Sequence, residues 1–348
     1  MNARFDIVTA DPRSDARWAA LARTTHGSLF TSPPWLDAVC ATYGFTPQAR
    51  IATSGGTPTA GFAWVAVDDL RGERLCSLPF SDRAEPLGTD GPTWCSLVDG
   101  LLTDDTRFTL RCLDSAAPTW DTRLRCGDDA AWHATRLDAP VDELRRRISG
   151  TARRNIAAAD RNGIRVEVSS EIDAVRHFHR LHVRLRKCKY RLLAQPLSFF
   201  ENLWHRFAPN DAVVTMLAFS GDDLAAGAIF LVWNDVLYYK FGASLAEYLV
   251  LRPNDAIYWA GIRWGVDRGL RLLDWGLSDL DQPGLVRYKR KWASEERRIL
   301  TLRSAGRPSP LQDEAGRLLG ELTGLLTEGA VPDEITARAG ALLYRYFC

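Results

Sequence analysis

Two stretches of this chain carry the same pattern of residues at an offset of 166 positions. Residues 52–62 align without a gap on residues 218–228, so that Gly61 falls on Gly227. Each copy reads as an apolar strand, a tight glycine turn and a second apolar strand that begins at the aligned glycine. Because a strand, a short glycine turn and a second strand form the pattern of a β-hairpin, the sequence predicts two copies of the same hairpin.

A helix precedes each hairpin in the same register. The segment that begins at Ser32 aligns at this offset with the segment that begins at Ser198, and both read as helices. A helix and a hairpin in one gapless register predict a duplicated α/β domain, and duplicated domains often share one cleft. We expect two domains, over residues 1–135 and 136–305, followed by a helical tail over residues 306–348.

Composition agrees with two domains and sets limits on their environment. The chain has 348 residues, 46% of them hydrophobic, which is enough for two separate cores. No apolar run approaches the ~20 residues of a membrane helix, and the first residues lack a signal-peptide pattern. The seven cysteines contain no Cys-x-x-Cys pair, which favours free thiols in a reducing cytoplasm over disulfides or a metal site.

Hydrophobic periodicity gives the order of elements in the second half. It reads as helix, strand, two helices, hairpin, strand, helix and strand, so we expect an α/β (α+β) fold with a mostly antiparallel sheet flanked by helices. The Pro, Gly and Asp residues of 114–140 predict a connection between the halves. The predicted helices are 13–24, 33–43, 92–101, 141–162, 172–187, 197–207 and 254–268, and the strands that follow the hairpins are 74–80, 236–244 and 270–276.

A mostly antiparallel sheet with a helix between two parallel, splayed strands is similar to the GNAT acyltransferases. Several segments resemble the FemAB-like branch of that superfamily, whose members carry two GNAT-like domains in one chain. The resemblance spans nearly the whole sequence and implies two tandem GNAT-like domains with the active cleft in the second. The segments that carry it are 154–164, 238–244, 252–255, 273–276 and 284–292, together with 32–35, 77–82 and 343–346.

The resemblance implies an N-acyltransferase that forms an amide bond. FemAB-like enzymes take an aminoacyl group from aminoacyl-tRNA, and the acceptor is then an amine of a cell-envelope precursor or a specialised metabolite. Two alternatives remain: an N-acyltransferase that uses a thioester on coenzyme A or an acyl carrier protein, and a non-catalytic binding subunit. We expect no metal and no bound cofactor.

One loop bears on the donor. GNAT enzymes bind the pyrophosphate of coenzyme A with a glycine-rich loop that opens the helix after the splayed strand. The corresponding segment here, residues 251–258, reads Leu-Arg-Pro-Asn-Asp-Ala-Ile-Tyr. It lacks the glycines that let a phosphate reach several backbone N–H groups, which favours aminoacyl-tRNA over coenzyme A.

Lysine is rare among the 44 basic residues of Lys and Arg type. A lysine that persists in an arginine-rich chain provides a compact ammonium group. The family's cell-wall enzymes use a lysine in the helix after Ser32 on the acceptor's phosphate. This chain has no lysine in its first half, which argues against a nucleotide-linked peptidoglycan acceptor. The five lysines are Lys187, Lys189, Lys240, Lys289 and Lys291.

The first candidate for catalysis is Lys289. In the family, a lysine that follows an aromatic residue after the last core strands is credited with stabilising charge at the reacting carbonyl, and Tyr288 and Lys289 hold that position here. A compact ammonium suits a developing oxyanion. The alternative is a solvated lysine in the basic run 287–291.

The strand 236–244 supplies two further candidates. Strand alternation puts Lys240 and Tyr238 on one face and Tyr239 and Phe241 on the other. One face belongs to the core, so either Lys240 or Tyr239 points into the cleft.

Other residues are candidates for substrate binding. Asp82 and Glu85 lie in a loop of the first domain, where carboxylates could hold a cationic amine or act as a base; a solvated turn is the alternative. The arginines of 145–161 and the run 184–189 could contact phosphates of tRNA, with solvated helix faces as the alternative. The resembling segments add Arg154, Ser244, Asn254 and Tyr288, and the end of the strand that begins near residue 270 adds Ser278 and Asp279.

Three histidines share one predicted helix. His177 and His179 are about 200° apart around it, so the set with His182 does not present one metal-binding face. We expect solvated helix rather than a metal site.

Overall fold

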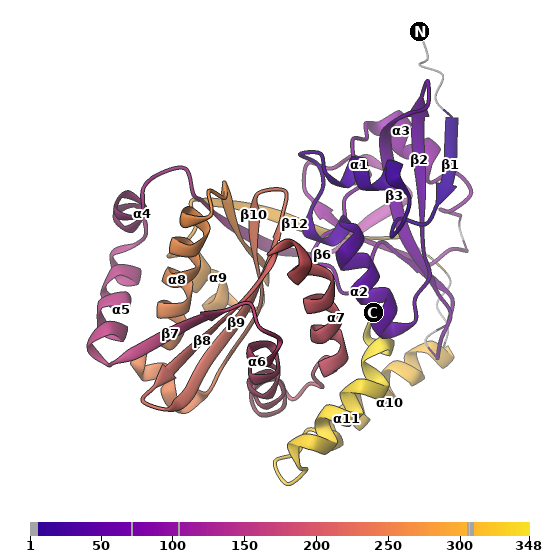
Figure 1. Ribbon diagram of the computed structural model, residues 1–348. Helices are drawn as coiled ribbons and strands as arrows, with labels where there is room; N and C mark the ends of the chain where they lie inside the picture. Colours follow the sequence, from indigo (N-terminus) through magenta and orange to yellow (C-terminus); the bar gives the residue numbers. More distant parts are fainter. Residues whose placement is uncertain (1–5, 71, 104, 305, 307–309) are drawn as a thin grey trace. The chain divides into compact units, whose positions relative to one another are not determined.

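The computed structural model describes residues 6–70, 72–103, 105–304, 306 and 310–348 (Figure 1). The chain divides into two compact units. Unit 1 comprises Met1–Ala130, Arg297–Leu319 and Arg345–Cys348, and unit 2 comprises Ala131–Glu296 and Gly320–Tyr344. Within the described residues, no helix has the length and apolar character that crossing a membrane requires.

The sheet of unit 1 runs in the order β1-β2-β3-β4-β5-β12. Neighbours pair antiparallel, except that β4 and β5 are parallel. The strands are β1 (Asp6–Ala10), β2 (Pro47–Ser54), β3 (Thr57–Val67), β4 (Arg74–Cys76), β5 (Phe108–Leu113) and β12 (Glu295–Ser304), and the helices are α1 (Ala16–Ala22), α2 (Pro33–Tyr43) and α3 (Gly91–Leu97).

Helix α2 has the bounds predicted from the sequence. The Ser32 hydroxyl accepts a hydrogen bond from the Trp35 N–H, and Pro33 occupies the first turn, where a missing N–H does no harm. The helix ends at Gly44, whose φ of 70° is the left-handed conformation that glycine adopts without strain.

Unit 2 contains the second sheet order, β6-β11-β10-β9-β8-β7. Helices α5 and α8 cover one face, and α6 and α7 cover the other (Figure 1). The strands are β6 (Leu124–Arg136), β7 (Ile164–Ser169), β8 (Val213–Ser220), β9 (Asp223–Trp233), β10 (Val236–Ser244) and β11 (Leu272–Asp279). The helices are α4 (Val141–Arg147), α5 (Gly150–Arg161), α6 (Ile172–Leu185), α7 (Leu197–Phe207), α8 (Pro253–Asp267), α9 (Pro283–Arg290), α10 (Pro310–Leu326), part of which belongs to unit 1, and α11 (Asp333–Leu343).

The duplicated hairpin predicted from the sequence is confirmed. Both β2–β3 and β8–β9 carry a β-bulge at the same aligned place, between Ala52 and Thr53 and between Ala218 and Phe219. The aligned glycine of each hairpin lies under a helix that precedes the hairpin, against Trp18 and Leu21 of α1 or Phe178 and Leu181 of α6. The two units thus repeat the same packing as well as the same strands.

The sequence predicts a connection over residues 114–140, but residues 124–136 of this range form β6. Its first half contains Gly127, Asp128 and Asp129, which are typical of turns, whereas residues 130–135 are buried. The predicted ranges 1–135, 136–305 and 306–348 differ from the two units, because β12 pairs with β5 and the helical tail is divided between the units.

The parallel strands β10 and β11 pair over a short stretch only. Their register runs from Val236↔Leu272 to Tyr238↔Asp274, although β10 continues to Ser244 and β11 to Asp279. Beyond this point β10 keeps its antiparallel pairing with β9 up to Ser244↔Ala226. The strands therefore separate, as the sequence predicts, and leave space between their ends.

The segment that follows α6 is fastened to α11 and to the turn before it. The buried Lys187 ammonium donates to the Val331 carbonyl oxygen and pairs with Asp333 at 2.8 Å. The Arg191 guanidinium donates to the carbonyl oxygens of Gly324 and Thr327. These bonds fix both ends of residues 187–191.

Gly340 of α11 allows this close approach, because a methyl group at its Cα would overlap the carbonyl oxygen of Ala194. We expect Gly340→Ala to lower the free energy of unfolding by roughly 1–3 kcal/mol, the cost of overpacking a site that cannot relax. Gly316→Ala, on α10 with open space around it, is the control and should raise stability by about 0.5–1 kcal/mol through helix propensity. Chemical denaturation checks both; equal effects would contradict tight docking of α11.

Candidate active site

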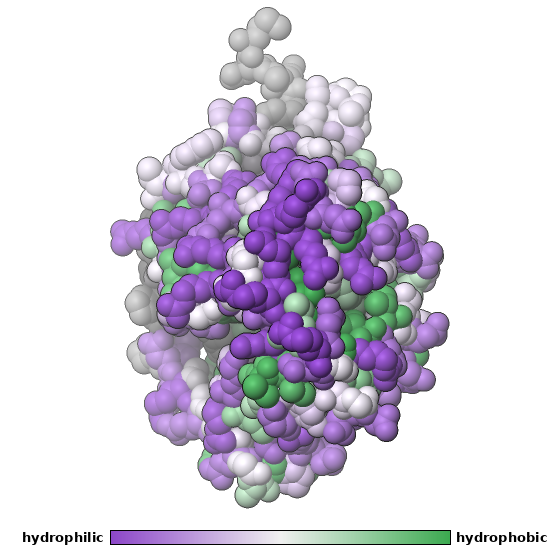
Figure 2. All heavy atoms as spheres, turned by 90° about the vertical axis from the view of Figure 1, so that its left-hand side faces the viewer, coloured by the Kyte–Doolittle hydropathy of each residue, from purple (hydrophilic) through white to green (hydrophobic). Residues whose placement is uncertain are grey.

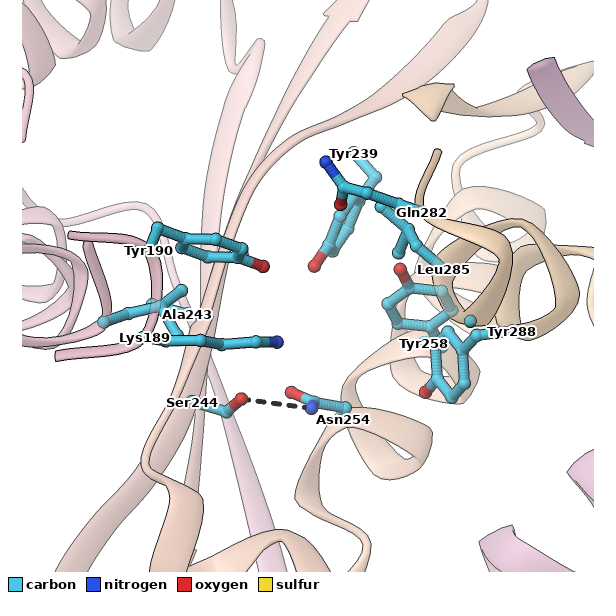
Figure 3. A pocket seen from close by; sticks show the side chains of 13 residues that line it. Lys189, Tyr190, Tyr239, Ala243, Ser244, Asn254, Tyr258, Gln282, Leu285 and Tyr288 are labelled. Atoms are coloured by element: carbon cyan, nitrogen blue, oxygen red, sulfur yellow. Dashed lines mark hydrogen bonds between the residues drawn. The ribbon is translucent and has the colours of Figure 1, made fainter. Parts of the chain in front are cut away.

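A cavity of about 690 Å³ opens in unit 2 beside the separated end of β10 (Figure 3). Four elements surround it: the end of α6, the last part of β10, the start of α8 and the segment leading into α9. Four predicted site residues line it. They are Tyr239, Ser244, Asn254 and Tyr288, joined by Leu185, Lys189, Tyr190, Gly242, Ala243, Tyr258, Gln282, Gly284 and Leu285.

A bulge in β10 decides which of its side chains reaches the cavity. Tyr239 pairs with Phe230 and Phe241 pairs with the next residue of β9, so Lys240 is the extra residue between them. Tyr239 and Phe241 consequently lie on opposite faces, and not on one face as simple alternation predicts. Phe241 packs on Phe200 at 4.9 Å between ring centroids, while Tyr239 lines the cavity.

Gly242 makes room for the Tyr239 side chain. A methyl group at Gly242 would overlap the hydroxyl oxygen of Tyr239. The Tyr239 hydroxyl therefore lies against the backbone of its own strand, where the hydroxyl of Tyr190 points toward it (Figure 3). Lys240 is not part of this lining; its ammonium lies 5.6 Å from the ring of Phe241.

Three phenol groups lie edge to face along the wall of the cavity. The ring of Tyr258 lies 4.9 Å from Tyr239 and 5.1 Å from Tyr288, and it stacks on Trp275 at 4.3 Å. Burial raises the pKa of Tyr239 to about 12 and the pKa values of Tyr258 and Tyr288 well above their ordinary range. These hydroxyls stay protonated at neutral pH and can donate hydrogen bonds to a substrate oxygen.

A buried carboxyl group lies behind the phenols. Asp255, in the first turn of α8, is 3% exposed and accepts a hydrogen bond from the Asn155 amide at 3.2 Å. Burial raises the pKa of Asp255, while Asn155, Arg252 and Lys291 act in the opposite direction. Asp255 in turn helps to raise the pKa of Tyr288. Asp255 belongs to the segment 252–255 that resembles the family, but its sequence pattern assigns it no role.

One lysine of the basic run 184–189, Lys189, enters the cavity. The end of α6 widens into a π-helical turn, Arg186–Tyr190, a distortion often found at functional sites. This turn directs the exposed Lys189 ammonium into the cavity, 5.0 Å from the ring of Tyr190 (Figure 3). Lys189 can hold an anionic group of a ligand.

Lys289 is not among the residues that line the cavity. It is 4% exposed, and its ammonium donates to the carbonyl oxygens of Leu277 at 2.8 Å and Gly276 at 3.3 Å. It thereby binds the end of β11, and it directly follows Tyr288 in the sequence. Its direct role at the reacting carbonyl stays a prediction.

The start of α8 offers few donors to a phosphate. Arg252 has a φ of 68°, and its carbonyl oxygen accepts the N–H groups of Asp255 and Ala256 at 3.1 and 3.3 Å. Pro253 has no N–H to offer. The buried carboxyl of Asp255 stands in the same turn. The turn is therefore poorly suited to a pyrophosphate.

The remaining predicted site residues are dispersed. In unit 2, Arg154 is exposed on α5, Ser278 is buried in β11 and Asp279 is exposed at its end. In unit 1, Glu85 accepts the Leu113 N–H at 3.0 Å and pairs with Arg83, which fixes its loop to β5. The loop residue Asp82 is half-buried in the same unit.

Two of the three histidines belong to the core. His179 and His182 are buried and contact Gln195 through its carbonyl oxygen at 3.0 Å and its side-chain oxygen at 2.6 Å. Burial lowers the pKa of His182 to about 3 and also lowers that of His179. His177 is exposed. The described residues contain no cluster of metal-binding side chains.

Residues 145–290 match the acetyltransferase (GNAT) domain family. The matched segment contains the separated strands and the cavity at their ends, so this part of the chain is a GNAT-type acyltransferase domain. The predicted resemblance to FemAB-like tandem GNAT proteins and the predicted enzyme class are confirmed.

Solved structures share the fold at low sequence identity. FemX superposes with a TM-score of 0.63 at 12% identity, over 85% of this chain and 96% of that chain. A tandem GNAT protein from the clavulanic acid biosynthesis pathway gives 0.54 at 13%, over 88% and 100%. L-PGS from Bacillus licheniformis gives 0.51 at 14%, over 85% and 98%. No curated protein sequence matches this chain.

Gly242→Ala tests the place of Tyr239. The added methyl group should displace the hydroxyl from the strand and expose the ring, so the pKa of Tyr239 should fall from about 12 toward its ordinary value. Titration of phenolate absorbance against the Tyr239→Phe variant measures this shift. Gly284→Ala, which adds its methyl to open space in the same cavity, is the control. An unchanged titration in Gly242→Ala would contradict the arrangement.

Proposed function

We propose that this protein transfers an aminoacyl group from aminoacyl-tRNA to an amine of a cell-envelope precursor or a specialised metabolite, in the cytoplasm where charged tRNA is available. One observation carries the choice of donor. The turn that opens α8 has Pro253, two engaged N–H groups and a buried carboxyl where a GNAT enzyme needs free donors for pyrophosphate. The similarity to FemX supports the tandem fold of such an enzyme.

A basic, hydrophilic face of unit 2 supports a polyanionic donor. The face that carries α4 and α5 is dominated by hydrophilic side chains (Figure 2). Arg147 is compensated by Asp138 and Glu143, and the other arginines of these helices have no carboxylate pairing among the described residues. Such charges attract a phosphate backbone without reading sequence. The exposed arginines are Arg145, Arg146, Arg153, Arg154 and Arg161.

The cavity provides the groups that ester aminolysis needs. In this scheme the acceptor nitrogen attacks the ester carbonyl, and charge builds on the carbonyl oxygen. The protonated hydroxyls of Tyr239 and Tyr258 donate to that oxygen. Lys189 holds a phosphate near the end of the donor. When the tetrahedral intermediate collapses, the bond to the ribose oxygen breaks and that oxygen takes a proton.

A proton must also leave the attacking amine. Tyr288 lines the cavity and stands beside the buried carboxyl of Asp255. We assign the phenol the role of passing the proton: its oxygen accepts the proton of the amine while its own proton moves to Asp255. Lys289 acts as a positioning residue, because it binds the β11 carbonyl oxygens next to this pair.

The donor can be tested with labelled substrates. The purified protein is mixed with total tRNA charged with radiolabelled amino acids and with a metabolite extract as the source of amines. The reaction should give a labelled product that resists mild base, since an amide survives conditions that cleave an ester. Ribonuclease treatment of the tRNA should abolish most of this product. Radiolabelled acetyl-coenzyme A is the comparison. Transfer from the thioester that ribonuclease leaves unchanged would overturn the proposed donor and favour the thioester alternative.

The proton path predicts a pH profile. Because the carboxylate form of Asp255 accepts the proton, turnover should fall as pH drops through its raised pKa. Asp255→Asn should lower turnover about 100-fold or more, since general base catalysis contributes roughly 10²–10⁴-fold. It should also remove the fall in turnover at low pH, the acidic limb of the profile. Tyr288→Phe should give a similar loss.

Asp267→Asn, at the exposed far end of the same helix, is the control and should keep both the rate and the limb. An acidic limb that persists in Asp255→Asn would contradict the assignment of the base. This result would leave the choice of donor untouched.

A further inference from the structure

Unit 1 has its own cavity at the end of a parallel strand pair. It measures about 510 Å³ and opens where β4 and β5 pair at Leu75↔Phe108 and Cys76↔Thr109. In the duplicated unit, β10 and β11 hold the corresponding place. Two of the residues that line the unit 1 cavity are cysteines, Cys76 and Cys348. All seven cysteines of the chain are free thiols.

Cys76 and Cys348 come together although they are far apart in the sequence. Cys76 ends β4 and lines the same cavity as Cys348, and each of the two thiols shifts the pKa of the other. The Arg74 guanidinium, two residues before Cys76, approaches the Cys348 sulfur at 3.4 Å and its carbonyl oxygen at 3.3 Å. Arg74 is itself held by Asp69 at 2.8 and 3.0 Å. The two thiols and a fixed cation therefore form one cluster.

Within this cluster the pKa values of the two thiols are shifted in opposite directions. The hydrogen bond from Cys76 and the nearby guanidinium of Arg74 lower the pKa of Cys348 to about 7 against the effect of burial. The hydrogen bond and burial raise the pKa of Cys76. Near neutral pH a large fraction of Cys348 is thiolate beside a protonated thiol. The thiolate is the nucleophile in disulfide exchange, and the neighbouring thiol is placed to resolve the product.

The other cysteines differ from this pair. Cys40 and Cys112 are buried in the core, where burial raises their pKa values. Cys95, Cys126 and Cys188 are exposed.

We propose that Cys76 and Cys348 form a redox-active dithiol that closes to a disulfide and locks residues 345–348 onto β4. The oxidant is a low-molecular-weight disulfide such as oxidised glutathione. The Cys348 thiolate attacks one of its sulfurs, which forms a mixed disulfide and releases one thiolate. Cys76 loses its proton and attacks the Cys348 sulfur, which releases the second thiol. The protein loses two electrons and two protons, and the oxidant is reduced to two thiols.

The disulfide would change one wall of the unit 1 cavity. Phe347 and Cys348 line it together with Arg107 and Arg111. In the reduced state, hydrogen bonds from Arg74 to the sulfur and the carbonyl oxygen of Cys348 hold this residue at β4. A covalent link would fix Phe347 in place. Access to this arginine-lined cavity would then depend on the oxidation state of the pair.

The test uses the full chain, reduced and then treated with oxidised glutathione near neutral pH. Peptide mapping without reductant should recover a peptide that links Cys76 to Cys348, with the loss of two hydrogen atoms. Amide hydrogen exchange over residues 345–348 should slow on oxidation and recover with reductant. Glutathione adducts on Cys95, Cys126 or Cys188 without the internal link would overturn the proposal, and unchanged exchange in the linked protein would overturn the locking.

Single substitutions separate the roles of the two sulfurs. Cys76→Ser should trap one glutathione on Cys348, because the resolving thiol is absent. Cys348→Ser should leave Cys76 unmodified. Cys95→Ser is the control and should form the link like the unchanged chain. The opposite pattern, with an adduct on Cys76 in Cys348→Ser, would contradict the assignment of Cys348 as the attacking thiol.

Discussion

The site in unit 2 depends on where the parallel pairing of β10 and β11 stops. After Tyr238↔Asp274 the two strands separate, while β10 continues to pair with β9. One edge of β10 thus remains anchored and the other faces an opening. Backbone groups on an open edge need partners, and in an enzyme such groups are available to a substrate. Helix α8 starts at this opening, so its first turn becomes part of the wall.

Charged groups buried around this opening act as structural supports. A buried ammonium is costly unless several acceptors satisfy it, and Lys289 meets this condition with the carbonyl oxygens of Gly276 and Leu277. Lys187 meets it with Val331 and Asp333. Both lysines therefore fix backbone segments next to the cavity. The compact ammonium suits this purpose, because three N–H donors fit among closely spaced oxygens where a planar guanidinium would not.

The sequence predicts well those elements whose ends are marked by neighbouring residues. Helix α2 is preceded by Ser32 and a proline and followed by Gly44, and these residues can be recognised in the sequence as helix ends. The glycines of the two hairpins likewise made the repeat recognisable. The strand β12 has no such signal: residues 295–298 are Glu-Glu-Arg-Arg, and its partners lie in β5, far away in the sequence.

The chemistry of the cavity was harder to predict than the fold. Lys240 and Tyr239 could not be separated, because the choice depends on a bulge that exists only once β10 pairs with β9. The place of Lys189 in the cavity and the role of Asp255 could not be predicted for a similar reason. One depends on a π-helical turn and the other on a left-handed Arg252, and neither conformation has a sequence signature.

The duplication also explains why the two cavities differ in chemistry. Strand β10 continues for six residues past its parallel pairing, with a bulge and Gly242 to accommodate aromatic rings. Strand β4 ends at Cys76, and the residues after it leave the strand at once: Leu78 and Phe80 have φ values of 57° and 60°. Such angles are unfavourable for bulky side chains, which is why the predicted strand over 74–80 is cut short. Among the described residues, β4 therefore does not continue past its parallel pairing as β10 does, and the cavity at its end is lined by the thiols of Cys76 and Cys348 and by arginines.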